Sequence, residues 1–464
     1  MEMICFRAQD RLQLYNANGD VRLCSWMDDQ YVGNLLDNTI EEVYCGERAK
    51  RVKERHASGD YSLCNKDQCP YVACGTQDSV LVPYERERTL PKQLCIGFER
   101  VCNYACPSCL VHQNMIDNAK CDLEHNYEII EKRVRDVMNF IPEISANGCG
   151  ELFVSKRTLG ILADWRPYEQ SDKCKVILET NGSLFDKSHW EQIENLGQYY
   201  LDVCVTVMSF NEQVYQYLSG CNLPIEQITD NLRFVSELRR KNVINNFQIG
   251  TVVQEQNFRE MPLFVKRCIE EFEADDVRLR PYEPWGAESR DVAWFKDVRV
   301  SDHPLHLEYR RIMEDPIFKH AKCSEGSGGL NAQWTDNSPF KMELMNQDIM
   351  AKVVMHPEML KERIEKACGG KPVVVYGFEP IGQVVSKVLI ETDCKIDYII
   401  AYKSKEKYLL GKRVIDLSDI TENESRNVVV IITPMHAKRK IQNELNWKGY
   451  MDTILITDLL NENK

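Results

Sequence analysis

The sequence predicts an α/β protein whose largest part is a parallel, curved sheet of six strands. Short apolar segments of strand length recur along the middle of the chain, and amphipathic segments of helix length separate them. The strand segments are residues 92–99, 142–148, 175–182, 203–210, 246–254 and 276–284. Strands joined by crossover helices run parallel, because the chain returns to the same edge of the sheet before each strand begins.

The segments between these strands carry the apolar spacing of helices. Ile130, Val134, Val137 and Ile141 fall on one face of a predicted helix. Residues 225–242 and 258–272 show the same spacing. Each predicted strand in the middle of the chain is thus followed by a segment that can return the chain across the sheet.

We expect the chain to contain four parts. Residues 1–88 are rich in cysteine and in turn signals such as "NANGD", and residues 89–300 hold the six-strand pattern. Residues 301–369 are expected to form a helical linker region. Residues 370–464 again alternate strands and helices, beginning with the strand "VVVYG", and predict a smaller Rossmann-like α/β domain.

The composition is that of a soluble globular protein. Of the 464 residues, 43% are hydrophobic and 28% are charged, and no apolar run reaches membrane length. The N-terminal segment "MEMICFRAQDR" lacks the apolar core of a secretion signal. A formal charge of -13 is mild for this length and argues against an extended nucleic-acid surface. We therefore expect a cytoplasmic protein without a membrane partner.

The cysteine content is high for a cytoplasmic chain. There are nineteen cysteines, and ten of them occur by Cys109. The cytoplasm keeps thiols reduced, so a disulfide framework is disfavoured, and ligation of a metal or cluster is the leading interpretation of the clustered thiols. Most cysteines from Cys149 onward are scattered and are expected to pack as small buried hydrophobes.

The segment "CNYACPSC" places Cys102, Cys106 and Cys109 on one short loop after the first predicted strand. Three thiolates on a tight loop suit an iron–sulfur cubane that leaves one iron without a protein ligand. A structural zinc ion needs a fourth ligand. His112 is the candidate for that position, although four ligands on one short loop would be crowded. Zinc and core packing are the alternatives to a cluster.

The position of this loop points to a known family. The C-terminal ends of the strands form the functional face of β/α barrels. The spacing Cys-x3-Cys-x2-Cys after a first strand resembles the signature of the radical S-adenosylmethionine superfamily, and the resemblance covers roughly residues 92–284. The segments "NGCGELF" and "ETNGSLF", after the second and third strands, resemble further elements of that family. The fold implied by the resemblance is a partial (β/α)6 radical-SAM barrel.

The resemblance also implies a chemistry and its residues. The loop cysteines Cys102, Cys106 and Cys109 would bind a [4Fe–4S] cluster whose fourth iron chelates S-adenosyl-L-methionine. Reduction by a donor such as flavodoxin or ferredoxin would yield a 5′-deoxyadenosyl radical that abstracts hydrogen from a substrate. The residues implied to contact the methionine or nucleoside part of the cofactor are Gly148, Gly150, Glu151, Thr180, Asn181 and Ser209.

The N-terminal cysteines suggest a second site. Cys5, Gly19 and Cys24, followed by "GN" and the group "CNKDQCPYVAC", resemble the SPASM/twitch type of auxiliary-cluster domain. A β-hairpin with its turn near "NANGD" would bring Cys5 and Cys24 together, and the later group would close the site.

The expected auxiliary ligands are Cys5, Cys24, Cys64 and Cys69, with Cys74 and Cys95 as alternates. Four available ligands favour a fully ligated auxiliary [4Fe–4S] cluster that relays electrons or holds the substrate cleft together. Zinc is the alternative metal, because two separated thiol pairs are a common zinc arrangement. Cys45 lies on a predicted helical stretch and is assigned to packing.

The start of the C-terminal domain has the shape of a dinucleotide-binding turn but not its full fingerprint. In "VVVYGFEPIG", Glu379 stands between Gly377 and Gly382, where a glycine normally lets the backbone approach a pyrophosphate. A carboxylate at that place would repel phosphate. We therefore interpret the domain as a module for docking or dimerisation, with a nucleotide or nucleotide-sugar binder as the alternative.

Two arginines on the last barrel strand, Arg278 and Arg280, are candidate substrate anchors, against simple alternation along a strand. The expected substrate is a sugar, a cyclitol or a nucleotide-linked small molecule, or else a ribosomal peptide. The expected reaction is hydrogen abstraction followed by oxidation, epimerisation, elimination or crosslinking. The alternative from another class is a non-catalytic scaffold, stapled by zinc or a cluster, whose C-terminal domain recruits a partner.

Overall fold

The computed structural model describes most of the chain. The residues outside the description are 1, 15, 28–30, 66–68, 74, 110–122, 147–149, 284–288, 326–329, 331–338, 403, 405, 421–425, 435–437 and 461–464. The chain divides into two compact units, Met1–Thr335 and Asp336–Lys464.

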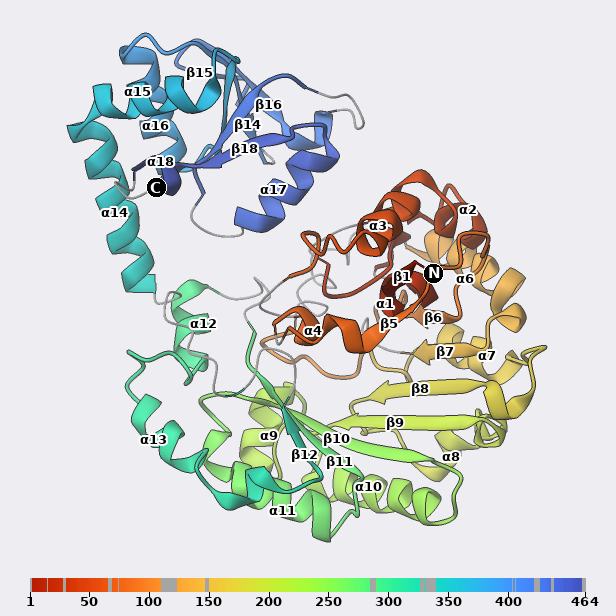
Figure 1. Ribbon diagram of the computed structural model, residues 1–464. Coiled ribbons are helices and arrows are strands. Elements are labelled where there is room, and N and C mark those ends of the chain that lie inside the picture. Colours follow the sequence, from red (N-terminus) through yellow and green to blue (C-terminus); the bar gives the residue numbers. More distant parts are fainter. Residues whose placement is uncertain are drawn as a thin grey trace. The chain divides into compact units, whose positions relative to one another are not determined.

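The first unit is built around a sheet of ten strands in the order β12-β11-β10-β9-β8-β7-β6-β2-β3-β4. Seven of these strands follow one another in chain order and pair in parallel (Figure 1). They are β6 (Gln93–Ile96), β7 (Glu143–Ala146), β8 (Lys175–Thr180), β9 (Tyr200–Thr206), β10 (Asn246–Val253), β11 (Asp276–Pro281) and β12 (Cys323–Glu325). The predicted α/β class with a parallel sheet is confirmed, and β6 to β11 fall on the six predicted segments.

The two sides of this sheet differ in polarity. In β8 and β9 alternate residues are fully buried, among them Val176, Leu178, Val203 and Val205. The residues between them are only partly buried and point to the opposite side, because side chains alternate along a strand. We call that side the polar sheet face. It is formed by Lys175, Glu179, Asp202, Cys204, Thr206, Gln248, Gly250, Asp276, Arg278 and Arg280.

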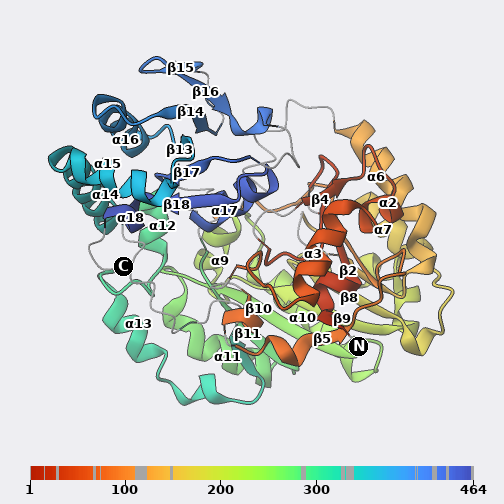
Figure 2. The same cartoon turned by 45° about the horizontal axis from the view of Figure 1, so that its top comes forward.

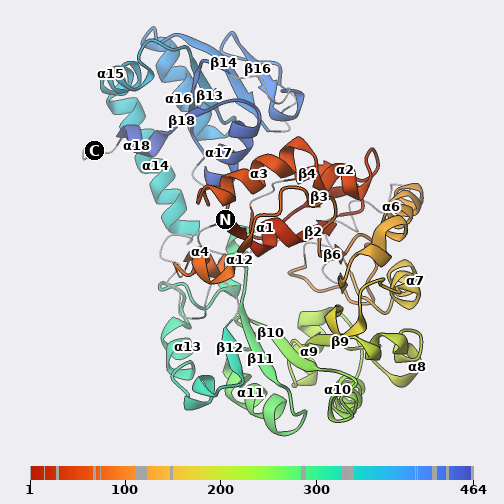
Figure 3. The same ribbon diagram turned by 45° about the vertical axis from the view of Figure 1, so that its right-hand side comes forward.

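Helices follow the strands and cover the apolar side of the sheet (Figure 3). In α10 the buried residues Ile228, Leu232 and Val235 recur at helical spacing, as the sequence predicts. The α-helices after β6 are α6 (Glu124–Val137), α7 (Lys156–Asp164), α8 (Lys187–Trp190), α9 (Glu212–Ser219), α10 (Ile225–Arg240), α11 (Met261–Glu270), α12 (Arg290–Lys296) and α13 (His306–Ile312). Short 3-10 helices are η2 (Met138–Phe140), η3 (Ser171–Lys173), η4 (Glu194–Gln198), η5 (Phe258–Glu260) and η6 (Pro316–Lys319).

The N-terminal segment continues the same sheet. Strand β2 (Arg11–Leu14) pairs in parallel with β6 and in antiparallel with β3 (Asp20–Arg22), which pairs with β4 (Tyr31–Asn34). The sequence predicts a separate domain for residues 1–88, whereas their strands share a sheet with the strands that follow. The difference arises because β2 presents a free edge that a parallel neighbour can use.

The β2–β3 pair is the hairpin expected around "NANGD". Gly19 lies in its turn with a φ of +84°, a conformation that favours glycine. The remaining elements of the segment are β1 (Met3–Cys5), which pairs with β5 (Leu81–Pro83), the helices α1 (Phe6–Asp10), α2 (Ile40–Tyr44), α3 (Glu47–Ala57) and α4 (Pro70–Ala73), and η1 (Gln77–Val80).

The second unit has its own sheet of six strands in the order β15-β16-β14-β13-β17-β18. All pair in parallel except β15 with β16. The strands are β13 (Val373–Tyr376), β14 (Ile396–Ala401), β15 (Tyr408–Leu409), β16 (Lys412–Asp416), β17 (Val429–Ile432) and β18 (Asp452–Leu455). The helices are α14 (Pro339–Met355), α15 (Pro357–Cys368), α16 (Pro380–Glu391), α17 (Lys438–Trp447) and α18 (Ile456–Leu460), with η7 (Leu417–Asp419).

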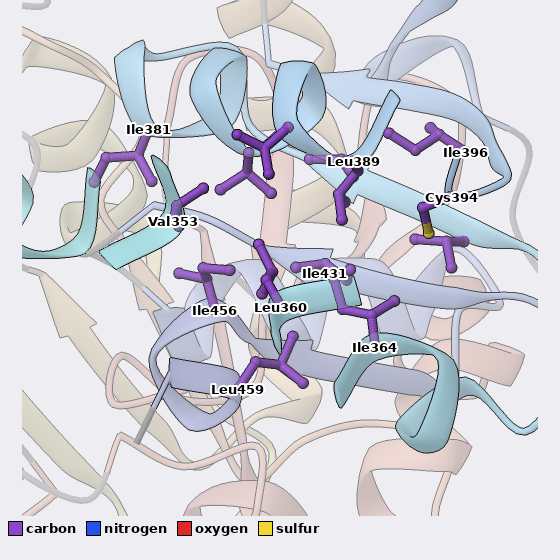
Figure 4. Packing of buried hydrophobic residues seen from close by; sticks show 14 of the residues in the cluster. Val353, Leu360, Ile364, Ile381, Leu389, Cys394, Ile396, Ile431, Ile456 and Leu459 are labelled. Atoms are coloured by element: carbon purple, nitrogen blue, oxygen red, sulfur yellow. The ribbon is translucent and has the colours of Figure 1, made fainter. Parts of the chain in front are cut away.

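Apolar packing on both faces of this sheet sets the extent of the second unit. On one face, Val353 of α14 and Leu360 of α15 share a core with Leu389 of α16 and Ile431 of β17 (Figure 4). On the other face, Leu445 of α17 packs in a second cluster. Because α14 and α15 bury their apolar sides here, they belong to this unit, and the expected linker region is divided between the two units.

The described helices include none whose length and apolar character would allow it to cross a membrane.

Shortening a central side chain of the second unit should destabilise it. Ile431 has no exposed surface and lies within the core of Figure 4, so Ile431→Ala should cost about 3 kcal/mol of unfolding free energy. Urea denaturation, followed by hydrogen exchange of peptides from the second unit, measures this loss. Met355→Ala is the control, because Met355 is 72% exposed. An equal effect of both substitutions would contradict the packing described.

Candidate functional site

The cysteine loop follows β6 at the end where all the parallel strands finish. Cys102, Cys106 and Cys109 are free and partly buried. The Tyr104 amide donates to the Cys102 thiol at 3.4 Å, and the Cys109 amide donates to the Cys106 carbonyl at 3.0 Å. These bonds fold the loop into tight turns. Cys102 and Cys109 also lie close enough to Cys106 to disfavour its ionisation. The loop therefore gathers its three thiols.

Helix α9 holds the loop from one side. The Ala105 amide donates to the Ser219 carbonyl at 3.0 Å, and the hydroxyls of Tyr104 and Tyr215 form a hydrogen bond. Gly220 ends the helix with a φ of +60°, and a Cβ at this position would lie 2.2 Å from the Ala105 carbonyl oxygen. Only glycine lets the end of this helix approach the loop so closely.

Glu151 holds the loop from the other side. Its backbone amide donates to the Val101 carbonyl at 2.7 Å. Its carboxylate is 2% exposed and accepts hydrogen bonds from the Thr180 hydroxyl at 2.5 Å and the Asn181 amide at 2.7 Å. One residue thus joins the cysteine loop, the segment after β7 and the segment after β8. Gly150 permits this contact, since a Cβ there would lie 2.2 Å from the Val101 carbonyl oxygen.

Asn181 faces the loop directly. Its side-chain amide donates to Asn103 Oδ1 at 3.0 Å and lies 4.0 Å from the Cys102 thiol. Its side-chain oxygen accepts from Ser183, whose hydroxyl in turn accepts from Asn103 Nδ2 at 2.8 Å. Asn181 is thus a predicted cofactor contact whose side chain reaches a loop thiol. The hydroxyl of Thr180, by contrast, donates its hydrogen bond to Glu151.

The donor set of the loop suits an iron–sulfur cluster. Burial raises the pKa of Cys102 to about 11 and that of Cys106 to about 12, so their thiolates need a nearby positive charge. Thiolates on one short loop can bind separate irons of a cubane, which leaves one iron without a protein ligand.

Three of the four expected auxiliary ligands lie close together. Cys24 and Cys69 are near enough to Cys5 to contribute, after burial, to raising its pKa to about 11. Backbone amides at the starts of two helices face two of these thiols: those of α1 face Cys5 and those of α4 face Cys69. Such amides stabilise thiolate charge. The hairpin and the later group therefore bring Cys5, Cys24 and Cys69 near one another.

Cys64 borders the same group. It forms an isolated antiparallel bridge with Met27, and the Asn65 amide donates to the Trp26 carbonyl at 2.8 Å. Its thiol lies 3.6 Å from His56 Nε2. Cys64 and Cys5 both lie near enough to Tyr61 to contribute to its raised pKa, for which burial is the largest cause. The bridge thus holds Cys64 beside the segment that carries Cys24.

The alternate auxiliary ligands Cys95 and Cys74 and the zinc candidate His112 do not all lie within the described residues. Cys95 is buried on β6, and its thiol accepts a hydrogen bond from Arg11 Nε at 2.8 Å. Cys74, His112 and Gly148 lie outside the described residues. Cys45 is partly buried and contacts the Thr89 carbonyl at 3.6 Å, in keeping with packing.

Arg11 lies beside the alternate Cys95 and the expected auxiliary ligand Cys24, a placement that sequence reasoning missed. Burial alone would lower the pKa of its guanidinium, but the nearby thiols of Cys95 and Cys24 and the Glu179 carboxylate raise it. Arg11 therefore lies between an auxiliary cysteine and the polar sheet face. The pairing of β2 with β6 creates this arrangement, and no local sequence motif predicts the position of Arg11.

Other predicted contacts are placed differently. Ser209 has no exposed surface, and its hydroxyl accepts from the Asn211 amide at 2.9 Å, so it shapes a turn after β9. Arg278 and Arg280 both lie on the polar sheet face. Arg278 contacts Asp276 of its own strand at 3.2 Å, and Arg280 Nη2 donates to Thr206 Oγ1 at 3.1 Å.

A lysine from outside the barrel strands reaches the cysteine loop. Lys296 of α12 is 4% exposed, and its ammonium donates to Ser108 Oγ at 3.0 Å. Cys221, next to Gly220, also lies within electrostatic range of Cys106. Sequence reasoning missed both residues, because each is far along the chain from the loop and carries no recognisable spacing.

Glu379 lies in the first strand–helix turn of the second unit. A Cβ on Gly382 would lie 2.4 Å from the Gly377 carbonyl oxygen, so this strand–helix turn is as tight as in dinucleotide-binding domains. The Glu379 carboxylate accepts a hydrogen bond from the Thr433 hydroxyl at 2.9 Å. It also lies against Gly377, since a Cβ there would be 2.8 Å from one of its oxygens. The Glu379 carboxylate thus lies inside this turn, against Gly377 and Thr433.

Comparison with known proteins bears on the N-terminal segment. Residues 5–70 match SPASM, an iron-sulfur cluster-binding domain. The predicted resemblance of this segment to an auxiliary-cluster domain is therefore confirmed. The matched range contains Cys5, Cys24, Cys64 and Cys69, while the alternates Cys74 and Cys95 lie beyond it.

The chain is also similar to a solved structure. The chain is similar to the crystal structure of Streptococcus suis SuiB bound to S-adenosylmethionine, at 13% identity over 70% of each chain and a TM-score of 0.32. A likeness this weak carries no argument here. No curated protein matches the chain.

A side chain at Gly150 should damage the cysteine loop. The Cβ of Gly150→Ala would lie 2.2 Å from a backbone oxygen of Val101, so the loop has to move. The reconstituted variant should then hold about four irons fewer per chain than the native protein. Anaerobic reconstitution followed by iron and sulfide analysis measures this.

Gly160→Ala is the matched control for this substitution. Its Cβ would meet only the end of the flexible Arg135 side chain, at 3.1 Å, so iron content should not change. Full iron content in the Gly150 variant would show that the loop tolerates displacement.

Proposed function

We propose that the chain is a radical S-adenosylmethionine enzyme with an auxiliary iron–sulfur cluster. The observation that carries this proposal is the cysteine loop at the carboxyl ends of the parallel strands. Cys102, Cys106 and Cys109 are gathered there, and Asn181 faces one of them. When bound, the cluster and S-adenosylmethionine would supply a 5′-deoxyadenosyl radical that abstracts hydrogen from a substrate.

The residues around the loop have separate tasks in this proposal. The loop thiols hold three irons, and Gly220 and Glu151 keep the loop in place from opposite sides. Asn181 is positioned to donate a hydrogen bond to the bound cofactor or to a cluster thiolate. Glu151 acts as a positioning residue, because Thr180 and Asn181 already occupy its carboxylate.

The auxiliary site would be a fully ligated [4Fe–4S] cluster held by Cys5, Cys24, Cys64 and Cys69. The match of residues 5–70 to an iron-sulfur cluster-binding domain supports a cluster over zinc. Arg11 separates this site from the polar sheet face, and its charge would compensate the negative cluster and its thiolates. In this proposal the auxiliary cluster relays electrons to or from the substrate.

The rest of the proposal concerns the substrate, the second unit and the location. The substrate would be a sugar, a cyclitol, a nucleotide-linked small molecule or a ribosomal peptide. The reaction would be an oxidation, an epimerisation, an elimination or a crosslinking. We assign the second unit to docking or dimerisation in a Rossmann-like fold, which the Glu379 carboxylate inside its first strand–helix turn supports. Flavodoxin or ferredoxin would deliver the electron, and the enzyme would act in the cytoplasm.

Replacing any loop cysteine should abolish cofactor cleavage. Cys102→Ala, Cys106→Ala and Cys109→Ala each remove one of three iron ligands, so none should release 5′-deoxyadenosine when reduced with dithionite in the presence of S-adenosylmethionine. Chromatography of the quenched reaction measures the product. Cys394→Ala, in the core of the second unit, is the control and should retain full release. Release by any loop variant would refute the assignment of that ligand.

Replacing an auxiliary cysteine should have a different effect. Cys69→Ala should lower the iron content by about four atoms per chain, yet the variant should still release 5′-deoxyadenosine and fail only in substrate turnover. Cys45→Ala, which lies in the same matched segment, should retain both clusters. Zinc in place of iron at this site, or loss of 5′-deoxyadenosine release with the loop cluster intact, would contradict the proposed division of labour.

A further inference from the structure

The polar sheet face carries two guanidinium groups that its other side chains do not fully use. Arg280 Nη2 donates to Thr206 Oγ1 at 3.1 Å, whereas Arg280 Nε is buried and makes no hydrogen bond in the described part of the chain. No carboxylate among the described residues forms an ion pair with Arg280. A buried guanidinium with unused donors is costly, because its lost hydration is not replaced.

A glycine gives Arg280 its position. Arg280 lies on β11 and Thr206 on β9, with β10 between them. The guanidinium crosses β10 above Gly250, where an added Cβ would lie 3.8 Å from both Arg280 Nη2 and the Cys204 thiol. The absence of a side chain at this position lets the guanidinium lie over the backbone of β10, so that it borders the space above Gly250.

Three other charged groups surround the same space. Glu179 pairs in register with Cys204 on the next strand, and its side chain is exposed on the polar sheet face. Arg278 is 43% exposed and contacts only Asp276 in these bonds. Burial raises the pKa of Cys204 to about 11. The Glu179 carboxylate adds to this rise, whereas Arg280 and Arg278 oppose it, so these groups lie around one thiol.

The charges favour one kind of ligand group. Asp276 offsets part of the charge of Arg278, while Arg280 forms no ion pair with a described carboxylate, so its guanidinium keeps unused donors beside the space above Gly250. Guanidinium forks bind the planar carboxylate and the phosphate group better than neutral groups. Glu179 stands at the rim and would accept a hydrogen bond from a hydroxyl or an ammonium of the same ligand.

We propose that Arg278 and Arg280 bind a carboxylate or phosphate group of the substrate above Gly250, so that the enzyme acts on an anionic substrate. This inference rests on the proposed function and names the substrate class for it. Arg280 and Thr206 lie near the carboxyl ends of their strands. The anion would therefore lie toward the same end of the sheet as the cysteine loop, with the reacting part of the substrate extending toward that loop.

The test uses the full, anaerobically reconstituted protein saturated with S-adenosylmethionine, with inorganic phosphate as the probe. Phosphate should raise the melting temperature relative to chloride at equal ionic strength. Arg280→Gln should weaken the apparent phosphate affinity at least about tenfold, because a charge-assisted pair is lost. Arg280→Lys should restore part of it. Arg240→Gln is the control, since Arg240 is 57% exposed and lies 3.9 Å from Glu273.

Each outcome decides the proposal. If Arg280→Gln does not hold its clusters, Arg278→Gln replaces it, because Arg278 is the more exposed of the pair and should also weaken phosphate binding. An unchanged phosphate response in these variants, or no response of the native protein to phosphate or acetate, overturns the assignment. The same measurement is made on protein without S-adenosylmethionine. A phosphate response found only there would assign the arginines to the carboxylate of that cofactor and overturn the proposal as well.

The same samples separate this inference from the proposed function. If the native protein releases no 5′-deoxyadenosine, the proposed function fails whatever the anion response. If release is intact in the native protein and in Arg280→Gln while the phosphate response is also unchanged, only the anionic substrate is refuted.

Discussion

The buried carboxylate of Glu151 is the interaction on which the candidate site depends most. Through its amide and its two carboxylate oxygens, this residue joins the cysteine loop to the segments that follow β7 and β8. The carboxylate is almost completely buried, so each of its hydrogen bonds replaces water that the group has lost. Removal of any partner would leave buried polar groups unpaired, and the loop would lose its fixed distance from the strand ends.

The N-terminal segment is mechanically continuous with the rest of the first unit. The pairing of β2 with β6 makes the hairpin between the expected auxiliary ligands Cys5 and Cys24 an extension of the sheet that carries the cysteine loop. A flexible tether between two domains would allow their relative position to vary. A shared sheet does not, and it keeps the Arg11 side chain within hydrogen-bond distance of the Cys95 thiol. An electron path between two cofactors benefits from such a constant separation.

Local patterns in the sequence predicted much of the fold and part of the site. Apolar runs separated by amphipathic segments predicted β6 to β11, and the "NANGD" turn predicted the first hairpin. Spacing singled out the loop cysteines and the auxiliary ones, since ligands on one loop or hairpin are close in sequence. The positions of Lys296 beside Ser108 and of Arg280 beside Thr206 follow only from the way distant strands and helices pack. Ser209 was predicted as a cofactor contact from its position in a motif. The motif does not reveal that its hydroxyl accepts a hydrogen bond from the Asn211 amide in its own turn.

The parallel register of β2 with β6 has a consequence for how the chain acquires its shape during synthesis. The β2–β3 hairpin needs only neighbouring residues and can form as soon as it leaves the ribosome. It then offers an edge to β6, and each later strand from β7 to β12 adds to the edge left by the one before it. The growing sheet therefore never has to insert a strand between two others. In a chain built in this order, each new strand covers the edge left by the one before it while β4 keeps the other edge, which limits the number of uncovered strands.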